Sequence, residues 1–373
     1  MANILVLGAK VPFTSGGQEI LVSTLIRELK ARDHRVDLVD LPYQALPKED
    51  LLRQAAYWRS IDFTSFGETK VDLVIATKFP TYYAKHPKKS LWLVHQHRPA
   101  YDLYAGRYSD ISDDPRDEQF RQLIVQGDNK VIAECEYISG ISKNVIERLQ
   151  HYNQIVGEVL YPPLPMGNSY RTGEFQDYIL SVGRLCSIKR VDLMLKAMPI
   201  VHGHVKLKIV GTPDEPGIME YFQNEIAKHS LQSRIEFLGR VSEEDLLSLF
   251  ANALGVFYAP HNEDYGYVTL EAFASGKPVL TAHDSGGVLE FVHHEQNGLI
   301  LEPTIDAFGH AANRLVENKP FAEELGKNGK AFIEKEFSGA GWDRVIERLL
   351  SPLQGIGTER ESIHIQSSQI VNG

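Results

Sequence analysis

Two acidic residues eight positions apart, Glu263 and Glu271, stand on either side of a glycine in the run Glu263-Asp264-Tyr265-Gly266-Tyr267-Val268-Thr269-Leu270-Glu271. Carboxylates held at this separation can bind hydroxyl groups on two parts of one ligand. Ser285-Gly286-Gly287 follows, and glycine allows backbone N–H groups to approach a phosphate closely. These residue types meet the needs of a nucleotide-sugar site, whereas the structural alternative is two surface acids and a helix cap.

A second candidate is the loop Gly183-Arg184-Leu185-Cys186-Ser187-Ile188-Lys189-Arg190, which contains Arg184 and Lys189. A guanidinium group binds a diphosphate through two hydrogen bonds, and a nearby ammonium acts as a point charge. Such a pair could neutralise the charge that builds on a departing nucleoside diphosphate. The alternative is a solvated basic turn, and the position of the loop after a predicted strand favours the functional interpretation.

Gly16-Gly17 stands between a predicted strand and a predicted helix. The free N–H groups and the positive end of such a helix suit a phosphate or a carboxylate, although a plain strand-to-helix turn is equally compatible. The fingerprint Gly-x-Gly-x-x-Gly does not occur at this turn, which argues against a nicotinamide-dependent enzyme.

His95-Gln96-His97-Arg98 follows another predicted strand. Two histidines two positions apart on an extended chain point to the same side, but no third ligand is spaced to join them, so we expect no metal site. His95 is interpreted as a polar contact to substrate. Tyr101-Asp102 fits either an acceptor contact or a structural turn.

The composition limits the class of protein. The chain has 373 residues, of which 43% are hydrophobic and 24% charged, a balance that suits a globular protein with two domains. A net charge of −10 argues against a nucleic-acid partner. Cys135 and Cys186 are the only cysteines, which fits a reducing compartment. The first apolar run is too short for a signal peptide or a membrane span, so we expect a cytoplasmic protein, with peripheral contact to the cytoplasmic face of the membrane left open.

Short apolar runs alternate with helical patterns through both halves of the chain, as in parallel sheets covered on both faces. The proline-rich segment Tyr161–Pro165 interrupts the alternation and is predicted to be a stiff connector. The expected strands are Asn3–Leu7, Arg35–Val39, Val71–Ala76, Leu91–Val94, Tyr137–Gly140, Tyr178–Val182, Lys206–Val210, Ile235–Leu238, Gly255–Tyr258, Pro278–Thr281 and Gly298–Leu301.

The candidate residues follow predicted strands, and ligands of open α/β sheets bind outside the carboxyl ends of the strands. Two such edges that face each other across the connector would form a cleft. The sequence therefore predicts an α/β protein with two Rossmann-like, doubly wound parallel-sheet domains facing an interdomain cleft.

With these motifs the chain resembles glycosyltransferase family 4, the retaining nucleotide-sugar transferases of the GT-B fold, from about Asn3 to Leu350. The most specific likeness runs from Glu263 to Gly287 and covers the paired-glutamate motif of the family and the glycine stretch behind it. The donor-phosphate motif is resembled by Val182–Leu185 with Lys189, and the strand end near the nucleobase by Val210-Gly211. The phosphate turn and histidine of the amino-terminal domain are resembled by Gly16-Gly17 with His95.

The resemblance implies a role for each matching residue. Arg184 and Lys189 would bind the donor diphosphate, Glu263 the donor sugar, and His95 the reacting centre; these four form the implied catalytic set. Donor binding is implied for Gly16, Gly17, Gly183, Arg184, Lys189, Gly211, Glu263, Tyr265, Gly266, Tyr267, Val268, Glu271, Ser285, Gly286 and Gly287, with Glu271 on the ribose. The expected acceptor contacts are His97, Arg98, Tyr101 and Asp102. Because the family is metal-independent, we expect no metal and no cofactor beyond the nucleoside-diphosphate-sugar substrate.

The expected organisation has five parts: 1–160 is the acceptor-side domain, 161–176 the linker, 177–340 the donor domain, 341–354 a helix packed back on the first domain, and 355–373 a disordered tail. One departure from the family pattern bears on the donor. Thr212–Gly217 replaces the usual glycine-rich continuation, which leaves the nucleobase open.

The expected activity is that of a retaining hexosyltransferase. It would move a sugar from a nucleoside-diphosphate donor to a hydroxyl of a glycan, lipid-linked or small-molecule acceptor, in polysaccharide or cell-envelope biosynthesis. The departing phosphate oxygen could take the acceptor proton on the same face, and no enzyme nucleophile is evident for a double displacement. Two alternatives stay open: a sugar-nucleotide epimerase of the same architecture, which would convert the donor without an acceptor, and a non-catalytic nucleotide-sugar binding protein.

Overall fold

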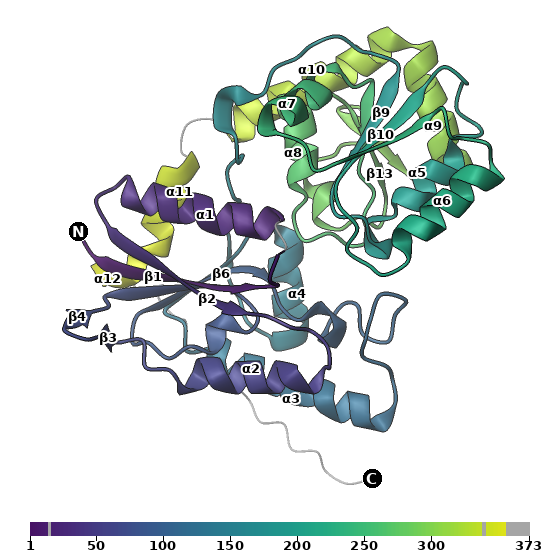
Figure 1. Ribbon diagram of the computed structural model, residues 1–373. Helices are drawn as coiled ribbons and strands as arrows, with labels where there is room; N and C mark the ends of the chain where they lie inside the picture. The colour runs from purple at the N-terminus through teal and green to yellow at the C-terminus, as the bar shows by residue number, and fades with distance from the viewer. Residues whose placement is uncertain (14–15, 338–340, 356–373) are drawn as a thin grey trace, which may run out of the picture.

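The computed structural model describes residues 1–13, 16–337 and 341–355 and contains two six-stranded parallel sheets, each with helices on both faces (Figure 1). The predicted α/β architecture with two doubly wound sheets is confirmed. Of the tail predicted over 355–373, every residue beyond Gly355 lies outside the described ranges.

The first sheet has the strand order β2-β1-β5-β6-β7-β8. Its strands are β1 (Asn3–Lys10), β2 (Arg35–Pro42), β5 (Leu73–Lys78), β6 (Lys89–His95), β7 (Tyr137–Gly140) and β8 (Glu158–Val159), and a separate antiparallel hairpin joins β3 (Ser65–Phe66) to β4 (Thr69–Lys70). The helices around this sheet include α1 (Gly17–Lys30), α2 (Glu49–Ser60), α3 (Pro115–Ile132) and α4 (Lys143–Asn153). The strand β5 is buried along its length, as expected for a parallel strand covered on both faces.

The second sheet has the strand order β11-β10-β9-β12-β13-β14. Its strands are β9 (Tyr178–Val182), β10 (Lys206–Val210), β11 (Ile235–Gly239), β12 (Gly255–Phe257), β13 (Val279–Ala282) and β14 (Gly298–Leu301). Its helices are α5 (Val191–Ala197), α6 (Ile218–Lys228), α7 (Glu243–Asn252), α8 (Tyr267–Ala274), α9 (Ile305–Glu317) and α10 (Lys319–Glu336). Short 3-10 helices lie in the loops: η1 (Thr81–Tyr83), η2 (Arg98–Ala100), η3 (Gly167–Ser169), η4 (Ser187–Lys189) and η5 (Gly287–Glu290).

The strand order reverses beside the first strand of each sheet. The strand β1 lies between β2 and β5, and β9 lies between β10 and β12. Loops on the two sides of such a reversal diverge to opposite faces and leave a crevice at the carboxyl edge of the sheet. Three residues selected from the sequence follow strands at these reversals, with Gly16 after β1, Arg184 after β9 and Glu263 after β12.

The chain passes from the first sheet to the second through the segment around η3. Its last helices, α11 (Gly341–Leu349) and α12 (Ser351–Gln354), lie against the first sheet (Figure 1). The hydroxyl of Ser90 in β6 donates to the carbonyl oxygen of Leu349 over 2.7 Å, and the rings of Trp92 and Trp342 meet edge to face with centroids 6.0 Å apart. The end of the described chain therefore packs on the domain in which the chain began.

In the part of the chain that the structure describes, no helix has both the length and the apolar character needed to cross a lipid bilayer. The same residues contain no group of three or more His, Cys, Asp or Glu side chains that could hold a metal ion.

The loops after β9 and β10 pack backbone against backbone at the carboxyl edge of the second sheet. Gly211 has a φ of 148°, and a Cβ added there would lie 1.8 Å from the carbonyl oxygen of Gly183. The N–H of Leu185 donates to the carbonyl oxygen of Thr212 over 2.9 Å. This contact holds the loop that carries Arg184 against its neighbour.

The substitution Gly211→Ala should shift the urea unfolding midpoint by the equivalent of at least about 2 kcal/mol, because the added carbon meets main chain that moves only with the sheet edge. Circular dichroism during urea titration measures the change. Gly203→Ala is the matched control, since no atom lies within 4 Å of a Cβ at that position. We expect an effect within about 0.5 kcal/mol there, and equal effects at the two positions would contradict the packing argument.

Candidate active site

The carboxyl edges of the two sheets share a cleft of about 400 Å³. Residues of both domains line it, and ten of them were selected from the sequence: Gly16, Gly17, His95, Gly183, Arg184, Lys189, Glu263, Tyr265, Gly266 and Tyr267. The tertiary structure thus brings together residues that are up to 251 positions apart in the sequence, from Gly16 to Tyr267.

Helix α1 presents its amino-terminal end to this cleft. Gly16 is the N-cap residue, and its N–H donates to the carboxylate of Glu19 over 2.8 Å. A Cβ added at Gly17 would lie 3.4 Å from the ring of Tyr267, the first residue of α8. The positive end of α1 therefore approaches the beginning of α8 in the other domain, where it can attract an anion bound between them.

Lys189 and Glu263 form an ion pair at the edge of the second sheet. Lys189 ends η4, and its ammonium also lies 3.3 Å from the hydroxyl of Tyr258. Arg184 lines the same cleft, pairs with the carboxylate of Asp214 and keeps 52% of its side chain exposed. The two cations selected from the sequence are therefore close to the first of the two selected acids.

His95 ends β6 and is held as a neutral imidazole. Burial lowers its pKa to about 4, and the nearby ammonium of Lys78 acts in the same direction. Its Nδ1 lies 2.8 Å from the carbonyl oxygen of Gln96, and a carbonyl oxygen can only accept, so Nδ1 carries the proton. The other ring nitrogen, Nε2, is then free of a proton and can accept a hydrogen bond from a ligand.

Glu271 lies inside a helix and not at its start. Gly266 adopts a φ of 87° and is the N-cap residue, so α8 begins at Tyr267 and Glu271 lies in its second turn. The side chain of Glu271 is buried, its carboxylate accepts a hydrogen bond of 3.0 Å from the hydroxyl of Tyr170, and burial raises its pKa to about 7. Tyr267 lies one helical turn earlier on the same face of α8 and lines the cleft.

Ser285, Gly286 and Gly287 serve backbone packing. The N–H of Gly287 donates to the carbonyl oxygen of Glu263 over 2.7 Å, and the N–H of Glu263 donates to the carbonyl oxygen of Ser285 over 3.1 Å. A Cβ at Gly287 would lie 2.5 Å from the carbonyl oxygen of Asp264. The close approach predicted for these glycines is thus made to the protein's own main chain, and it positions Glu263. Val268 and Gly211 are likewise buried or packed beside the cleft without lining it.

The four residues selected as acceptor contacts do not line the cleft. His97 is buried, its Nδ1 lies 3.2 Å from the hydroxyl of Tyr43, and burial lowers its pKa to about 3. The hydroxyl of Tyr101 donates to the carboxylate of Asp128 over 2.6 Å inside the first domain. These two interpretations are corrected, because both side chains are used in the core of the first domain.

The other two acceptor candidates, Arg98 and Asp102, belong to a cluster of charges that spans the domain interface. Arg148 of the first domain donates to the carboxylate of Asp264 in the second over 2.6 Å and lies 3.4 Å from Asp102. Arg98 lies 3.9 Å from Asp264, and the amide of Asn262 donates to Asp102 over 2.7 Å. Burial would raise the pKa of Asp264, but Arg148 and Arg98 hold it at about 2. The cluster fixes the segment beside Glu263 against the first domain.

Lys78 is a residue of the cleft that our sequence analysis missed. It ends β5, is only 6% exposed and lines the cleft. Burial lowers its pKa to about 8. No described residue accepts a hydrogen bond from its ammonium, which lies 5.6 Å from the centre of the ring of Tyr43. The sequence offered one signal for Lys78, namely its position just behind an apolar strand, because the predicted strand ends two residues before it, at Ala76.

Known proteins resemble this chain in sequence over part of its length. Residues 168–332 match the family model described as glycosyl transferases group 1. An uncharacterized glycosyltransferase of Methanocaldococcus jannaschii is 30% identical over 176 residues, which cover 46% of this chain and 43% of that protein. The alpha-1,3/1,6-mannosyltransferase ALG2 of Homo sapiens is 25% identical over 246 residues, which cover 60% of this chain and 58% of that protein. The chain thus spans about half the length of these curated relatives, and the predicted resemblance to this group is confirmed.

Solved structures share the fold over nearly the full chain. The structure of Anabaena HepE in complex with UDP and glucose has a TM-score of 0.71 at 16% identity, covering 94% of this chain and 100% of that one. Sucrose-phosphate synthase from Thermosynechococcus elongatus has a TM-score of 0.74 at 17% identity, covering 95% of this chain and 98% of that one. The fold is therefore GT-B, as the sequence predicted.

The substitution Arg148→Met should reduce the free energy of unfolding by roughly 3 kcal/mol, because it leaves the buried carboxylate of Asp264 with one cation fewer. Urea or thermal unfolding measures the loss. Arg53→Met is the matched control, since Arg53 is 78% exposed and pairs with Asp50 at the surface, where we expect at most about 1 kcal/mol.

The double variant R148M/D264N removes both charges and should be less destabilised than the sum of the two single variants. A loss in R148M no larger than that in R53M would contradict a structural role of the interdomain cluster.

Proposed function

We propose that this chain, whose residues 168–332 match the group 1 glycosyl transferases, is a retaining glycosyltransferase. It would transfer a sugar from a nucleoside diphosphate to a hydroxyl group of an acceptor. The observation that carries the proposal is the ion pair of Lys189 with Glu263 in a cleft that also receives the amino-terminal end of α1 and the neutral imidazole of His95.

The donor diphosphate would lie between the domains. Arg184 and Lys189 offer positive charge from the second domain, and Lys78 with the amino-terminal end of α1 offers it from the first. A group with two negative phosphates balances such opposed charges better than a neutral ligand does. The solved structure of Anabaena HepE with UDP and glucose, which has the same fold, is consistent with a nucleoside-diphosphate donor.

The sugar and ribose would be held by the two acids. On binding of a diphosphate, Lys189 can exchange Glu263 for a phosphate oxygen, which frees the carboxylate of Glu263 for hydroxyl groups of the sugar. Glu271 is buried in α8 one turn behind Tyr267, which lines the cleft; in this proposal its carboxylate would accept hydrogen bonds from the ribose hydroxyls.

In the proposed reaction, the bond between the anomeric carbon and the diphosphate oxygen breaks, and a bond from that carbon to the acceptor oxygen forms on the same face. The acceptor proton passes to the departing diphosphate oxygen, so the atoms and charges balance without an enzyme nucleophile. Arg184, Lys189 and Lys78 would stabilise the charge on the leaving group. His95, neutral at physiological pH, would contact the transferred sugar through a hydrogen bond without adding charge.

The substitution Glu263→Gln should reduce turnover by at least about 100-fold while the affinity for nucleoside diphosphate changes by less than about threefold, because the sugar loses a carboxylate and the diphosphate keeps its cations. Release of nucleotide from UDP-, GDP- and ADP-sugars measures turnover, and calorimetry measures binding. Glu68→Gln on the exposed hairpin is the matched control.

Unchanged turnover in E263Q would refute the role of Glu263. Failure of all three nucleotide-sugars to bind would refute the transferase proposal. Conversion of the donor to an epimer without any acceptor would show that the protein is an epimerase and not a transferase.

The affinity for UDP-glucose should rise about eightfold between pH 6 and pH 7.5. The raised pKa of Glu271, about 7, leaves this carboxyl mostly protonated at pH 6 and mostly ionised at pH 7.5, and only the ionised form accepts from both ribose hydroxyls. The range stops at pH 7.5 because Lys78, with its pKa of about 8, still keeps most of its proton there but is half deprotonated at pH 8. The diphosphate diester of the probe carries a constant charge over this range.

In Glu271→Gln the pH dependence should disappear, whereas Glu68→Gln should keep it. An unaltered pH profile in E271Q would show that another group is responsible.

A further inference from the structure

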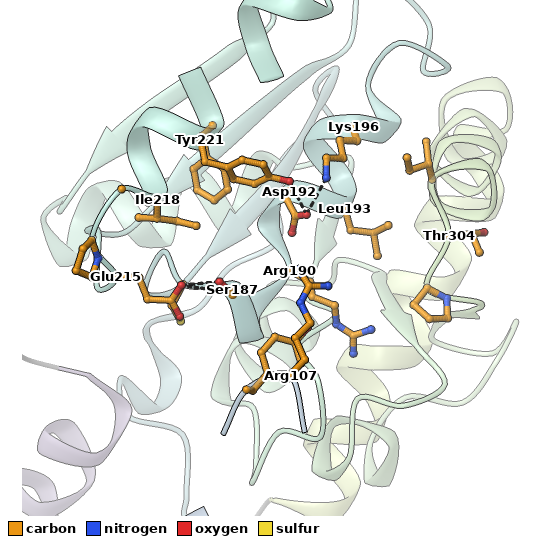
Figure 2. A pocket seen from close by; sticks show the side chains of 17 residues that line it. Arg107, Ser187, Arg190, Asp192, Leu193, Lys196, Glu215, Ile218, Tyr221 and Thr304 are labelled. Atoms are coloured by element: carbon orange, nitrogen blue, oxygen red, sulfur yellow. Dashed lines mark hydrogen bonds and ion pairs between the residues drawn. The ribbon is translucent and has the colours of Figure 1, made fainter. Parts of the chain in front are cut away.

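A second cavity, of about 710 Å³, is lined in part by the loop 183–190 (Figure 2). Gly183, Arg184 and Lys189 of this loop line the cleft, whereas Cys186, Ser187 and Arg190 line the second cavity. Arg190 has a left-handed backbone with a φ of 52°, which turns the chain between the cleft and the second cavity. The cavity is therefore separated from the reaction centre by a single loop.

The walls of the second cavity come from both domains. The starts of α5 and α6 form the second-domain side, and Arg107 with Tyr108 projects from the first domain. Tyr108 reaches across the interface, since its ring lies 5.3 Å from that of His261 in the second domain. The loop that carries Arg107 follows Tyr101-Asp102, in a part of the first domain where the sequence predicts the acceptor side.

Two arginines bring positive charge and unpartnered donors to this cavity. Arg107 is exposed and forms no hydrogen bond or ion pair with any residue of the described ranges. Its guanidinium group lies 5.7 Å from the centre of the ring of Tyr108. Arg190 donates to Asp284 over 2.7 Å, but its Nε is buried without a hydrogen-bond partner. Burial raises the pKa of Tyr108 and both guanidinium groups oppose the rise, which places both within electrostatic reach of one hydroxyl.

The two acids in the cavity already have hydrogen-bond partners in the protein. Glu215 accepts hydrogen bonds from the N–H of Ser187 over 3.0 Å and from its hydroxyl over 2.5 Å. Asp192 accepts from Lys196 over 3.2 Å and from the hydroxyl of Tyr221 over 3.2 Å (Figure 2). Neither carboxylate pairs with Arg107 or Arg190 in the described structure, so an anionic ligand would meet the guanidinium of Arg107 and the unpartnered Nε of Arg190.

Two aromatic side chains give the cavity a surface for a sugar ring. Tyr108 stands on the first-domain side, and Tyr221 in α6 lies on the second-domain side with 37% of its surface exposed. A tyrosine ring offers a flat apolar face beside a polar hydroxyl, which suits a ligand with C–H and hydroxyl groups. Arginine and tyrosine together favour a ligand that combines a sugar ring with an acidic group.

We propose that this cavity binds an acidic saccharide, whose carboxylate or phosphate is held by Arg107 and Arg190 and whose ring lies against Tyr108 and Tyr221. This proposal rests on the proposed transferase function in one respect, because it treats the saccharide as a part of the acceptor. The acceptor would then extend from the cleft around the loop 183–190, so that its acidic unit is recognised by the second cavity while its hydroxyl reaches the donor.

Binding can be tested without turnover by saturation-transfer NMR and calorimetry on the full chain, with UDP-glucose present to occupy the cleft. The probes are glucuronate, glucose 6-phosphate, glucose and inorganic phosphate. We expect the two acidic sugars to bind at least about tenfold more tightly than either glucose or inorganic phosphate.

Arg107→Gln should weaken the binding of the acidic sugars by about fivefold or more, and it should fold normally because Arg107 is exposed and unpaired in the described structure. The matched control is Arg116→Gln, an exposed arginine elsewhere in the first domain, which should leave binding unchanged. Equal binding of glucose, equal binding of inorganic phosphate, absence of binding of both acidic sugars, or insensitivity to R107Q would each overturn the proposal.

The same measurements separate this inference from the transferase assignment. If no nucleotide-sugar binds but the acidic sugars bind in an Arg107-dependent manner, the transferase proposal fails and the saccharide site stands. If nucleotide-sugar turns over while the acidic sugars bind independently of Arg107, the transferase proposal stands and the saccharide site fails.

Discussion

Asp264 carries a negative charge at the interface between the two domains, where burial alone would favour its neutral form. Arg148 and Arg98 keep it ionised, with a pKa of about 2. Both arginines belong to the first domain and Asp264 to the second, so the domains have to meet for this buried charge to be balanced. The preceding residue is Glu263, and the same contact therefore sets where this acid stands relative to the first sheet.

The cleft beside this contact collects positive charge from both domains. Lys78 and the amino-terminal end of α1 face it from the first, and Arg184 and Lys189 from the second. Glu263 balances Lys189, but the buried ammonium of Lys78 has no hydrogen-bonding counter-charge among the described residues. A diphosphate held between the sheets would relieve this imbalance, which links the domain arrangement to the proposed chemistry.

Much of the fold could be predicted because its signals are local. Apolar runs of four or five residues predicted β7, β9, β10 and β14 with the observed bounds, and the two-residue strand β8 was missed because it is too short to show a pattern. The rule that ligands bind beyond the carboxyl ends of strands was enough to gather Gly17, His95, Arg184, Lys189 and Glu263, since each follows a strand or opens the next helix.

The sequence by itself therefore determined the two sheets and which strand ends carry the polar residues of the cleft. The tertiary structure alone decided which side chains are free to meet a ligand. Tyr101 is bound to Asp128 in the core, Gly287 packs against the main chain of Asp264, and Arg148 pairs with that same aspartate 116 positions away. Such partners are set by the packing of distant segments, and burial then fixes their charge, so neither residue type nor spacing along the chain could reveal them.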